Sequence, residues 1–189
     1  MANIIYVTGG ARSGKSSFAE EQAKKHNSVL YIATAACLDE EMQYRILRHQ
    51  QQRPKTWHTI EEQLKPYTYI NACVQEEAIL LDCLSVWVSN LMLQYWNDDE
   101  SGFTCAKNDL IDLVLVEIEQ LVLAAQKYNK TLIIVSNEVG SGIVPMSTLA
   151  RYYRDCLGLC NQKIAKVANK VYWCVSGIPT LIKGEKNEK

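Results

Sequence analysis

A glycine-rich segment near the start of the chain constrains the fold more than any other feature. Residues 9–16 read G-x-x-x-x-G-K-S; the apolar run before them, 3–8, predicts a buried strand, and residues 16–26 predict a helix. Backbone N–H groups of such a loop turn inward and bind phosphate oxygens, and the positive end of the helix points at the same anions. The order strand, loop, helix therefore predicts a nucleoside triphosphate site rather than a chance glycine turn.

Three side chains are candidates for catalysis and metal binding. Lys15 can reach the β and γ phosphates, and the Ser16 hydroxyl can ligate Mg²⁺. Asp82 ends a second apolar run, the usual position of a carboxylate that holds Mg²⁺, although a helix N-cap would use the same residue. The motif predicts these nucleotide-binding residues: Gly9, Gly10, Ala11, Arg12, Ser13, Gly14, Lys15 and Ser16.

Apolar runs alternate with helix-like segments along the rest of the chain. Further strands are expected at 29–34, 56–60, 78–82, 131–136 and 171–175, the last of the chain, and further helices at 39–52, 86–96, 107–127 and 147–169. Continuous apolar strands separated by helices predict an α/β, P-loop NTPase-like (RecA-like) fold, with a mainly parallel central sheet and helices on both faces. We expect one nucleotide-binding catalytic domain, 1–183, and a disordered tail, 184–189.

Polar residues follow several of the expected strands. Because ligands gather at the carboxyl ends of parallel strands, Thr8, Thr34, Asp82, Asn137 and Glu138 are expected to lie near one another. The last two open a glycine-rich loop, 137–145, which is either a shaped wall of the site or a plain tight connection. The convergence of these residues is more informative than any one of them.

Composition excludes several classes of protein. A net charge of −1 leaves no basic surface for nucleic acid, and the longest uncharged stretch, 83–97, is too short to span a membrane. No signal-peptide pattern precedes the glycine-rich loop. Seven scattered cysteines without a C-x-x-C pair are typical of reduced thiols, so we expect a cytoplasmic protein in which Cys156 and Cys160 are core residues.

His49 is a candidate nucleophile. On the expected helix 39–52 it lies one turn after Arg45 and one turn before Arg53, so the three share a face. Flanking guanidinium groups disfavour the protonated ring and attract phosphate, as attack on phosphorus requires. The residues alone nevertheless favour a solvated surface histidine on a charged helix.

Motifs along nearly the whole chain, about 4–182, resemble the bifunctional adenosylcobinamide kinase/adenosylcobinamide-phosphate guanylyltransferase family. They include the phosphate loop, Arg53-Pro54 before Trp57, Leu81-Asp82-Cys83-Leu84, Ala150-Arg151, and Val175-Ser176-Gly177. The run Asn137-Glu138-Val139-Gly140-x-Gly142-Ile143-Val144-Pro145 is more specific than the phosphate loop. Two positions depart from the family: Ser85 stands where Thr is frequent, and Leu159 stands where Arg is common, which puts a phosphate or subunit contact there in doubt.

The resemblance implies two reactions. ATP or GTP phosphorylates adenosylcobinamide, and GTP then donates GMP to the product through a guanylyl-histidine, giving adenosylcobinamide-GDP. The resemblance places that histidine at His49 and implies a homo-oligomer, with a trimer as the expected form. It adds nucleotide contacts at Thr34, Ala35, Ala36, Arg53, Glu61 and Asp82, and the corrinoid candidates are Glu138, Arg151, Arg154 and Asn161.

Two other functions compete with this one. A kinase-only enzyme would leave His49 idle. A nucleotide-dependent switch would need an effector domain or a charged docking surface, for which 189 compact residues leave little room.

Overall fold

Six parallel strands form most of one central sheet. The computed structural model describes residues 2–35, 54, 56–72, 75–97 and 102–185. Within them the sheet has the order β3-β2-β4-β7-β1-β8-β9, and only β9 runs antiparallel to its neighbour. The strands are β1 Asn3–Gly9, β2 Val29–Ala33, β3 His58–Glu61, β4 Ala78–Asp82, β7 Thr131–Asn137, β8 Lys170–Val175 and β9 Ile178–Lys183. The expected mainly parallel α/β fold is confirmed.

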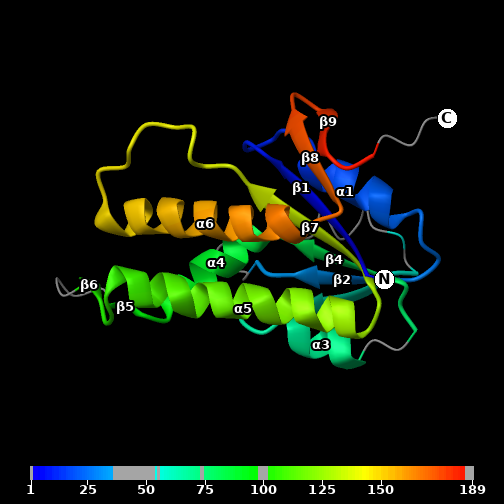
Figure 1. Ribbon diagram of the computed structural model, residues 1–189, viewed down its shortest axis with the longest axis horizontal. Coiled ribbons are helices and arrows are strands. Elements are labelled where there is room, and N and C mark those ends of the chain that lie inside the picture. Colours follow the sequence, from blue (N-terminus) through cyan, green and yellow to red (C-terminus); the bar gives the residue numbers. More distant parts are fainter. Residues whose placement is uncertain (1, 36–53, 55, 73–74, 98–101, 186–189) are drawn as a thin grey trace.

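Helices cover both faces of the sheet (Figure 1). Helix α1, Lys15–Ala23, buries Ala19 and Ala23 with one set of alternating strand residues. The opposite face packs against α4 Leu84–Leu93, α5 Lys107–Lys127 and α6 Thr148–Val167, with α3 Tyr67–Ala72 beside α5. Strand side chains alternate between faces, so each face has its own apolar core.

The periodic helix α5 begins and ends at the predicted residues. Its buried side chains, which recur every three or four residues, are Leu110, Val114, Ile118, Leu121, Val122 and Ala125. Such spacing places one apolar stripe against the sheet layer. Strands β4 and β7 likewise contain the buried runs that the sequence predicted.

Other elements correct the expectations. Contrary to expectation, strand β8 is not the last strand, because β9 follows it. Strand β9 is the outermost strand of the sheet, where Pro179 and a largely exposed strand are tolerated. Helix α4 ends at Leu93 rather than Trp96, because Trp96–Asn97 forms strand β5 and pairs with β6, Gly102–Phe103. The expected helix 39–52 lies outside the described residues.

Candidate functional site

The phosphate loop joins β1 to α1 and packs against the turn between β8 and β9. Gly14, at the N-cap of α1, has φ 88°, and a Cβ there would lie 2.9 Å from the Gly177 Cα. A Cβ on Gly9 would clash with the Cys174 carbonyl oxygen. The Gly177 N–H donates to the Ser13 carbonyl at 2.9 Å, so a hydrogen bond as well as close packing joins the loop to this turn. Glycine is therefore required at both positions of the motif.

Lys15 is the first residue of α1, and its side chain reaches back to this loop. Its side chain is buried, and Nζ donates to the Gly10 carbonyl at 3.0 Å. Burial lowers the pKa of Lys15, while the nearby Cys83 and Asp82 act in the opposite direction. A phosphate bound at the loop would supply a negative countercharge for the buried ammonium group of Lys15. The position fits the phosphate-binding role that the motif predicts.

Asp82 is held at the end of β4 by hydrogen bonds from Tyr31 of β2 and from Thr34, which follows β2. The Tyr31 hydroxyl donates to Asp82 Oδ2 at 2.7 Å, and the Thr34 N–H donates to the Asp82 carbonyl at 3.1 Å. The Asp82–Cys83 peptide is cis. Because the N-cap of α4 is Cys83, Asp82 is not the cap of that helix. The metal interpretation of Asp82 thus remains as a prediction.

Thr34 holds the Asp82–Cys83 turn by hydrogen bonds and is not exposed to solvent. It is fully buried, and its hydroxyl donates to the Cys83 carbonyl at 2.8 Å and accepts from the Cys83 N–H at 2.9 Å. Asn90 of α4 donates to the Thr34 carbonyl at 2.8 Å and to the Gln63 carbonyl at 3.3 Å. Asn90 therefore ties the end of β2 to the segment after Glu61, a predicted nucleotide contact. Sequence reasoning missed this role; an amide within the apolar helix α4 was the available signal.

The donor set fits Mg²⁺ bound together with a nucleotide. In the described ranges, no group of three or more His, Cys, Asp or Glu side chains could hold a metal ion by itself. Mg²⁺ is commonly held by one or two protein oxygens, with substrate phosphates and waters completing its shell. Ser16 lies in the first turn of α1, and Lys15 beside it interacts with Asp82, so these two oxygen donors belong to one edge of the sheet.

The corrinoid candidates Asn161, Glu138 and Arg151 make hydrogen bonds within the protein. Asn161 is buried; its Oδ1 accepts from the Ser136 hydroxyl at 2.7 Å, and its Nδ2 donates to the Asn137 carbonyl at 3.1 Å. The carboxylate of Glu138 accepts the Gly140 N–H, and its own N–H donates to the Gly9 carbonyl at 3.1 Å. Arg151 donates to the carbonyls of Pro145, at 3.2 Å, and Met146, at 2.6 Å. The loop 138–147 is thus shaped by side chains at both ends.

Arg154 is the corrinoid candidate that lines an open cleft. This cleft, of about 640 Å³, lies between the loop and α6 and is lined by Gly140, Gly142, Val144, Arg154, Asp155, Gly158, Leu159 and Gln162. Arg154 Nε lies 3.8 Å from Asp155 Oδ1, and Lys107 Nζ lies 2.6 Å from Asp155 Oδ2. Leu159, where the family commonly has Arg, adds an apolar side chain to this cleft. Ile143 and Met146 on the loop are each 96% exposed.

Three predicted site residues, His49, Arg53 and Ala36, lie outside the described residues. Ala35 follows Thr34 directly, and Glu61 ends β3 opposite Ala33 of β2, on the same sheet edge as Asp82. The structure therefore brings together the phosphate loop, Thr34, Ala35, Glu61 and Asp82, and it adds Tyr31 and Asn90 to them.

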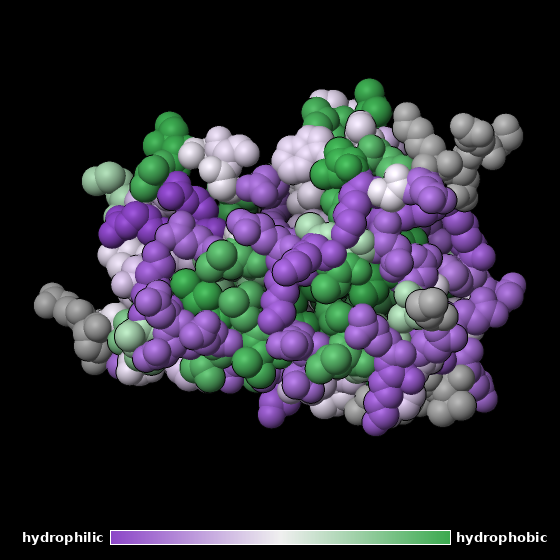
Figure 2. Space-filling model, in the orientation of Figure 1, coloured by the Kyte–Doolittle hydropathy of each residue, from purple (hydrophilic) through white to green (hydrophobic). Residues whose placement is uncertain are grey.

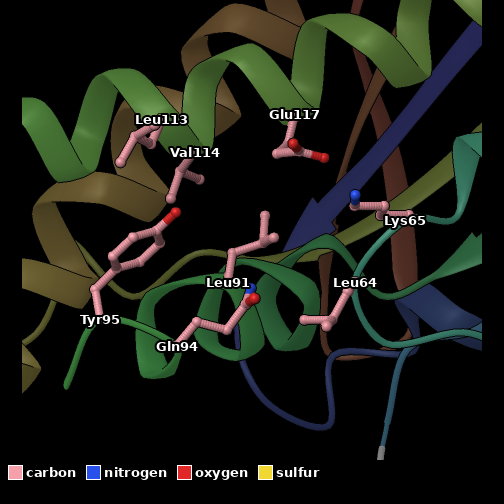
Figure 3. A pocket seen from close by; sticks show the side chains of 8 residues that line it. All are labelled: Leu64, Lys65, Leu91, Gln94, Tyr95, Leu113, Val114 and Glu117. Carbon is pink, nitrogen blue, oxygen red and sulfur yellow. The ribbon is translucent and has the colours of Figure 1, made fainter. Parts of the chain in front are cut away.

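A separate cavity lies between α4 and α5 (Figure 3). It has a volume of about 230 Å³ and is lined by Leu64, Lys65, Leu91, Gln94, Tyr95, Leu113, Val114 and Glu117. Glu117 Oε2 is buried, with no hydrogen-bond partner among the described residues. Burial raises the pKa of the neighbouring Tyr67, and Glu117 raises it further.

Among the helices that the structure describes, none combines the length and the apolar character of a membrane-spanning segment.

Comparison with known proteins gives one consistent result. A family model described as cobinamide kinase / cobinamide phosphate guanyltransferase matches residues 5–182. The bifunctional adenosylcobalamin biosynthesis protein CobU of Escherichia coli is 42% identical over 184 residues, covering 95% of this chain and 99% of that protein. The protein of the same name from Salmonella typhimurium is 43% identical, with 95% and 99% covered, and CobP of Pseudomonas aeruginosa is 38% identical, with 95% and 96% covered.

Proposed function

The chain belongs to the cobinamide kinase / cobinamide phosphate guanyltransferase family, and from that premise we propose that one phosphate loop serves both of its reactions. The protein is a bifunctional cobinamide kinase and cobinamide phosphate guanylyltransferase of adenosylcobalamin biosynthesis. The observation that carries the proposal is the buried Lys15 within a loop built to bind phosphate, beside Asp82. Both reactions need that loop, because both act on the phosphates of a nucleotide.

In the kinase step, the terminal hydroxyl of the aminopropanol arm of adenosylcobinamide attacks the γ phosphorus of ATP or GTP. The new O–P bond forms as the bond to the β-phosphate oxygen breaks, the nucleoside diphosphate leaves, and the hydroxyl proton passes to solvent. Lys15 and the loop N–H groups stabilise charge on the phosphates, and Ser16 and Asp82 are the proposed Mg²⁺ ligands. Mg²⁺, when bound, neutralises charge on the β and γ phosphates.

In the transfer step, a ring nitrogen of His49 attacks the α phosphorus of GTP and pyrophosphate leaves. The phosphate of adenosylcobinamide phosphate then attacks the same phosphorus, which releases His49 and gives adenosylcobinamide-GDP. A histidine phosphoramidate is reactive enough for this second displacement. Support for His49 comes from its place before Arg53-Pro54 in the sequence.

We assign the corrinoid to the cleft beside the loop 138–147. Arg154 lines that cleft, whereas Glu138, Arg151 and Asn161 hold the surrounding backbone in place. The exposed Ile143 and Met146 offer apolar contact for a large ring system. The nucleotide and corrinoid would then meet at Gly9, whose carbonyl accepts the Glu138 N–H.

A homo-oligomer, with a trimer as the expected form, and a cytoplasmic location complete the proposal. Helix α5 exposes Leu113, Val116 and Leu123, and Figure 2 shows apolar surface across the face that α5 and α6 form. In the described residues, the cysteines are free thiols, as is usual in the cytoplasm. Light scattering of the purified protein measures the oligomer directly, and a monomeric mass would contradict that part of the proposal.

A product assay tests the function. The protein is incubated with adenosylcobinamide and GTP, and the corrinoid products are identified by mass spectrometry. We expect adenosylcobinamide phosphate followed by adenosylcobinamide-GDP, and Lys15→Ala should reduce both by about a hundredfold or more. Lys24→Ala, at the exposed end of α1, is the matched control.

Other outcomes would favour the competing functions. Phosphorylation without any guanylylated product would identify a kinase-only enzyme. Nucleotide hydrolysis that does not respond to adenosylcobinamide would favour a nucleotide-dependent switch.

A further inference from the structure

Tyr31 is a buried tyrosine in the otherwise aliphatic strand β2. Its side chain is only 2% exposed, and the strand reads Val-Leu-Tyr-Ile-Ala. Phenylalanine would fill the same space, so the hydroxyl needs a separate explanation. We infer that Tyr31 is a positioning residue that orients the Asp82 carboxylate for Mg²⁺. This inference rests on the proposed function, in which Asp82 is a ligand of the nucleotide-bound metal.

The hydrogen bond between the two residues crosses neighbouring parallel strands. Ala33 of β2 is in register with Asp82 of β4, and Tyr31 lies two residues earlier on the same face. From there the Tyr31 hydroxyl reaches along the sheet to Asp82 Oδ2, at 2.7 Å. A bond of this length to a carboxylate is among the stronger hydrogen bonds in proteins. It occupies one carboxylate oxygen and leaves Oδ1 for the metal or one of its waters.

Packing holds the Tyr31 ring in place. The ring stacks on Trp57, with centroids 6.3 Å apart and planes 25° apart. Trp57 is 9% exposed, and its backbone N–H donates to the Pro54 carbonyl at 3.0 Å. A stacked, buried ring has few rotamers, so the hydroxyl is fixed before the metal arrives. Such partners of metal ligands orient the ligand and reduce the ordering that binding requires.

The backbone at Asp82 is fixed independently of Tyr31. Thr34 donates its N–H to the Asp82 carbonyl, and its hydroxyl holds Cys83. Removing the Tyr31 hydroxyl should therefore release the rotation of the carboxylate without displacing the strand end. A purely structural hydroxyl would instead affect stability and leave metal binding unchanged.

The test is the Mg²⁺ dependence of nucleotide binding in Tyr31→Phe. The probe is α,β-methylene GTP without adenosylcobinamide, so that neither phosphoryl transfer nor guanylylation takes place. Calorimetry measures its affinity over a series of Mg²⁺ concentrations, with EDTA as the zero point. Losing one hydrogen bond to a charged group should raise the half-maximal Mg²⁺ concentration about tenfold and leave the affinity in EDTA unchanged. Phe keeps the ring and its stacking, and thermal unfolding verifies that the variant folds.

Two control variants make the test specific. Tyr172→Phe removes a hydroxyl from another tyrosine, which packs edge-on against Phe18, and should leave the Mg²⁺ dependence unchanged. In an Asp82→Asn background, Tyr31→Phe should add no further change, because the effect passes through the carboxylate.

The outcomes separate this inference from the proposed function. A Tyr31→Phe variant with the wild-type Mg²⁺ dependence would overturn the positioning role while leaving the metal role of Asp82 intact. A wild-type protein whose analogue binding ignores Mg²⁺ would overturn both assignments. The product assay decides independently whether the two activities are present.

Discussion

At the scale of single residues, buried polar groups within the sheet connect protonation to stability. Tyr6 of β1 is 2% exposed, and its hydroxyl lies near those of Thr8 and Ser136. Burial is the main cause that raises the pKa of Tyr6 from 10.0 to about 12; the charge of Glu138 acts in the same direction, and the two hydroxyls oppose it. The folded protein therefore favours the neutral phenol more strongly than the unfolded chain does.

This difference predicts a loss of stability in alkali. Because the folded pKa is the higher one, the contribution is fully present below pH 10.0 and is lost as the pH rises towards about 12. It amounts to about 2–3 kcal/mol in the free energy of unfolding. Urea unfolding of wild type and Tyr6→Phe is measured from about pH 8 to about pH 12. The free energy of unfolding of the variant should rise relative to that of wild type only at high pH. Parallel profiles would contradict the prediction.

The residues of the site differ in how far the sequence could predict them. Lys15 and the loop glycines carry a motif in which spacing alone specifies the chemistry. Asn161 and Arg151 are predicted at the corrinoid, and the structure adds that their hydrogen bonds run to backbone in β7 and in the loop. The role of Tyr31 depends on the register between β2 and β4, which no local pattern encodes.

At the scale of elements, the loop 138–147 and helix α6 act as one unit. Arg151 on α6 donates to two carbonyls of the loop and, at 3.1 Å, to the Thr148 hydroxyl. We therefore expect Arg151→Ala to loosen the loop and raise the KM for adenosylcobinamide about tenfold, with little change in the KM for GTP.

A control on the same helix completes this prediction. Lys163→Ala removes an exposed ion pair with Glu119, 3.2 Å long, and should change neither constant, because surface ion pairs contribute little. Equal changes in both KM values for Arg151→Ala would indicate damage to the whole site rather than to the corrinoid side.

The elements also show where sequence patterns succeed. Helix α5 was predictable to the residue because a long apolar stripe has a clear period. Strand β9 was missed because an exposed edge strand has no such period. Helix α3 was missed because six residues after Pro66 are too few for one.

At the scale of the whole molecule, α4 links the core to the site. Trp87 is fully buried in the core that α4, α5 and α6 share, and its Nε1 donates to the Leu64 carbonyl at 2.8 Å. Trp87→Ala should lower the free energy of unfolding by about 3–5 kcal/mol, through lost burial and a cavity. Trp96→Ala, at a half-buried ring in β5, should cost less, and urea unfolding compares the two. Equal losses would contradict this account of the core.

The sheet order brings the parts of the proposed nucleotide site to one edge of the sheet. Strands β1 and β4 flank β7, so the phosphate loop, Asp82 and the Asn137-Glu138 loop open from the same edge. That convergence was predictable from the polar residues after each apolar run. The strand order itself was not, since crossovers between distant strands leave no local signal.

We propose that this one site both phosphorylates and guanylylates, with His49 as the covalent carrier. The most direct measurement is incubation with GTP labelled at the α phosphate, followed by denaturation and mapping of the labelled peptide. We expect an acid-labile, base-stable label on His49 that is lost in His49→Ala and transferred to the corrinoid when adenosylcobinamide phosphate is added. A protein that makes adenosylcobinamide-GDP while His49 stays unlabelled would contradict it.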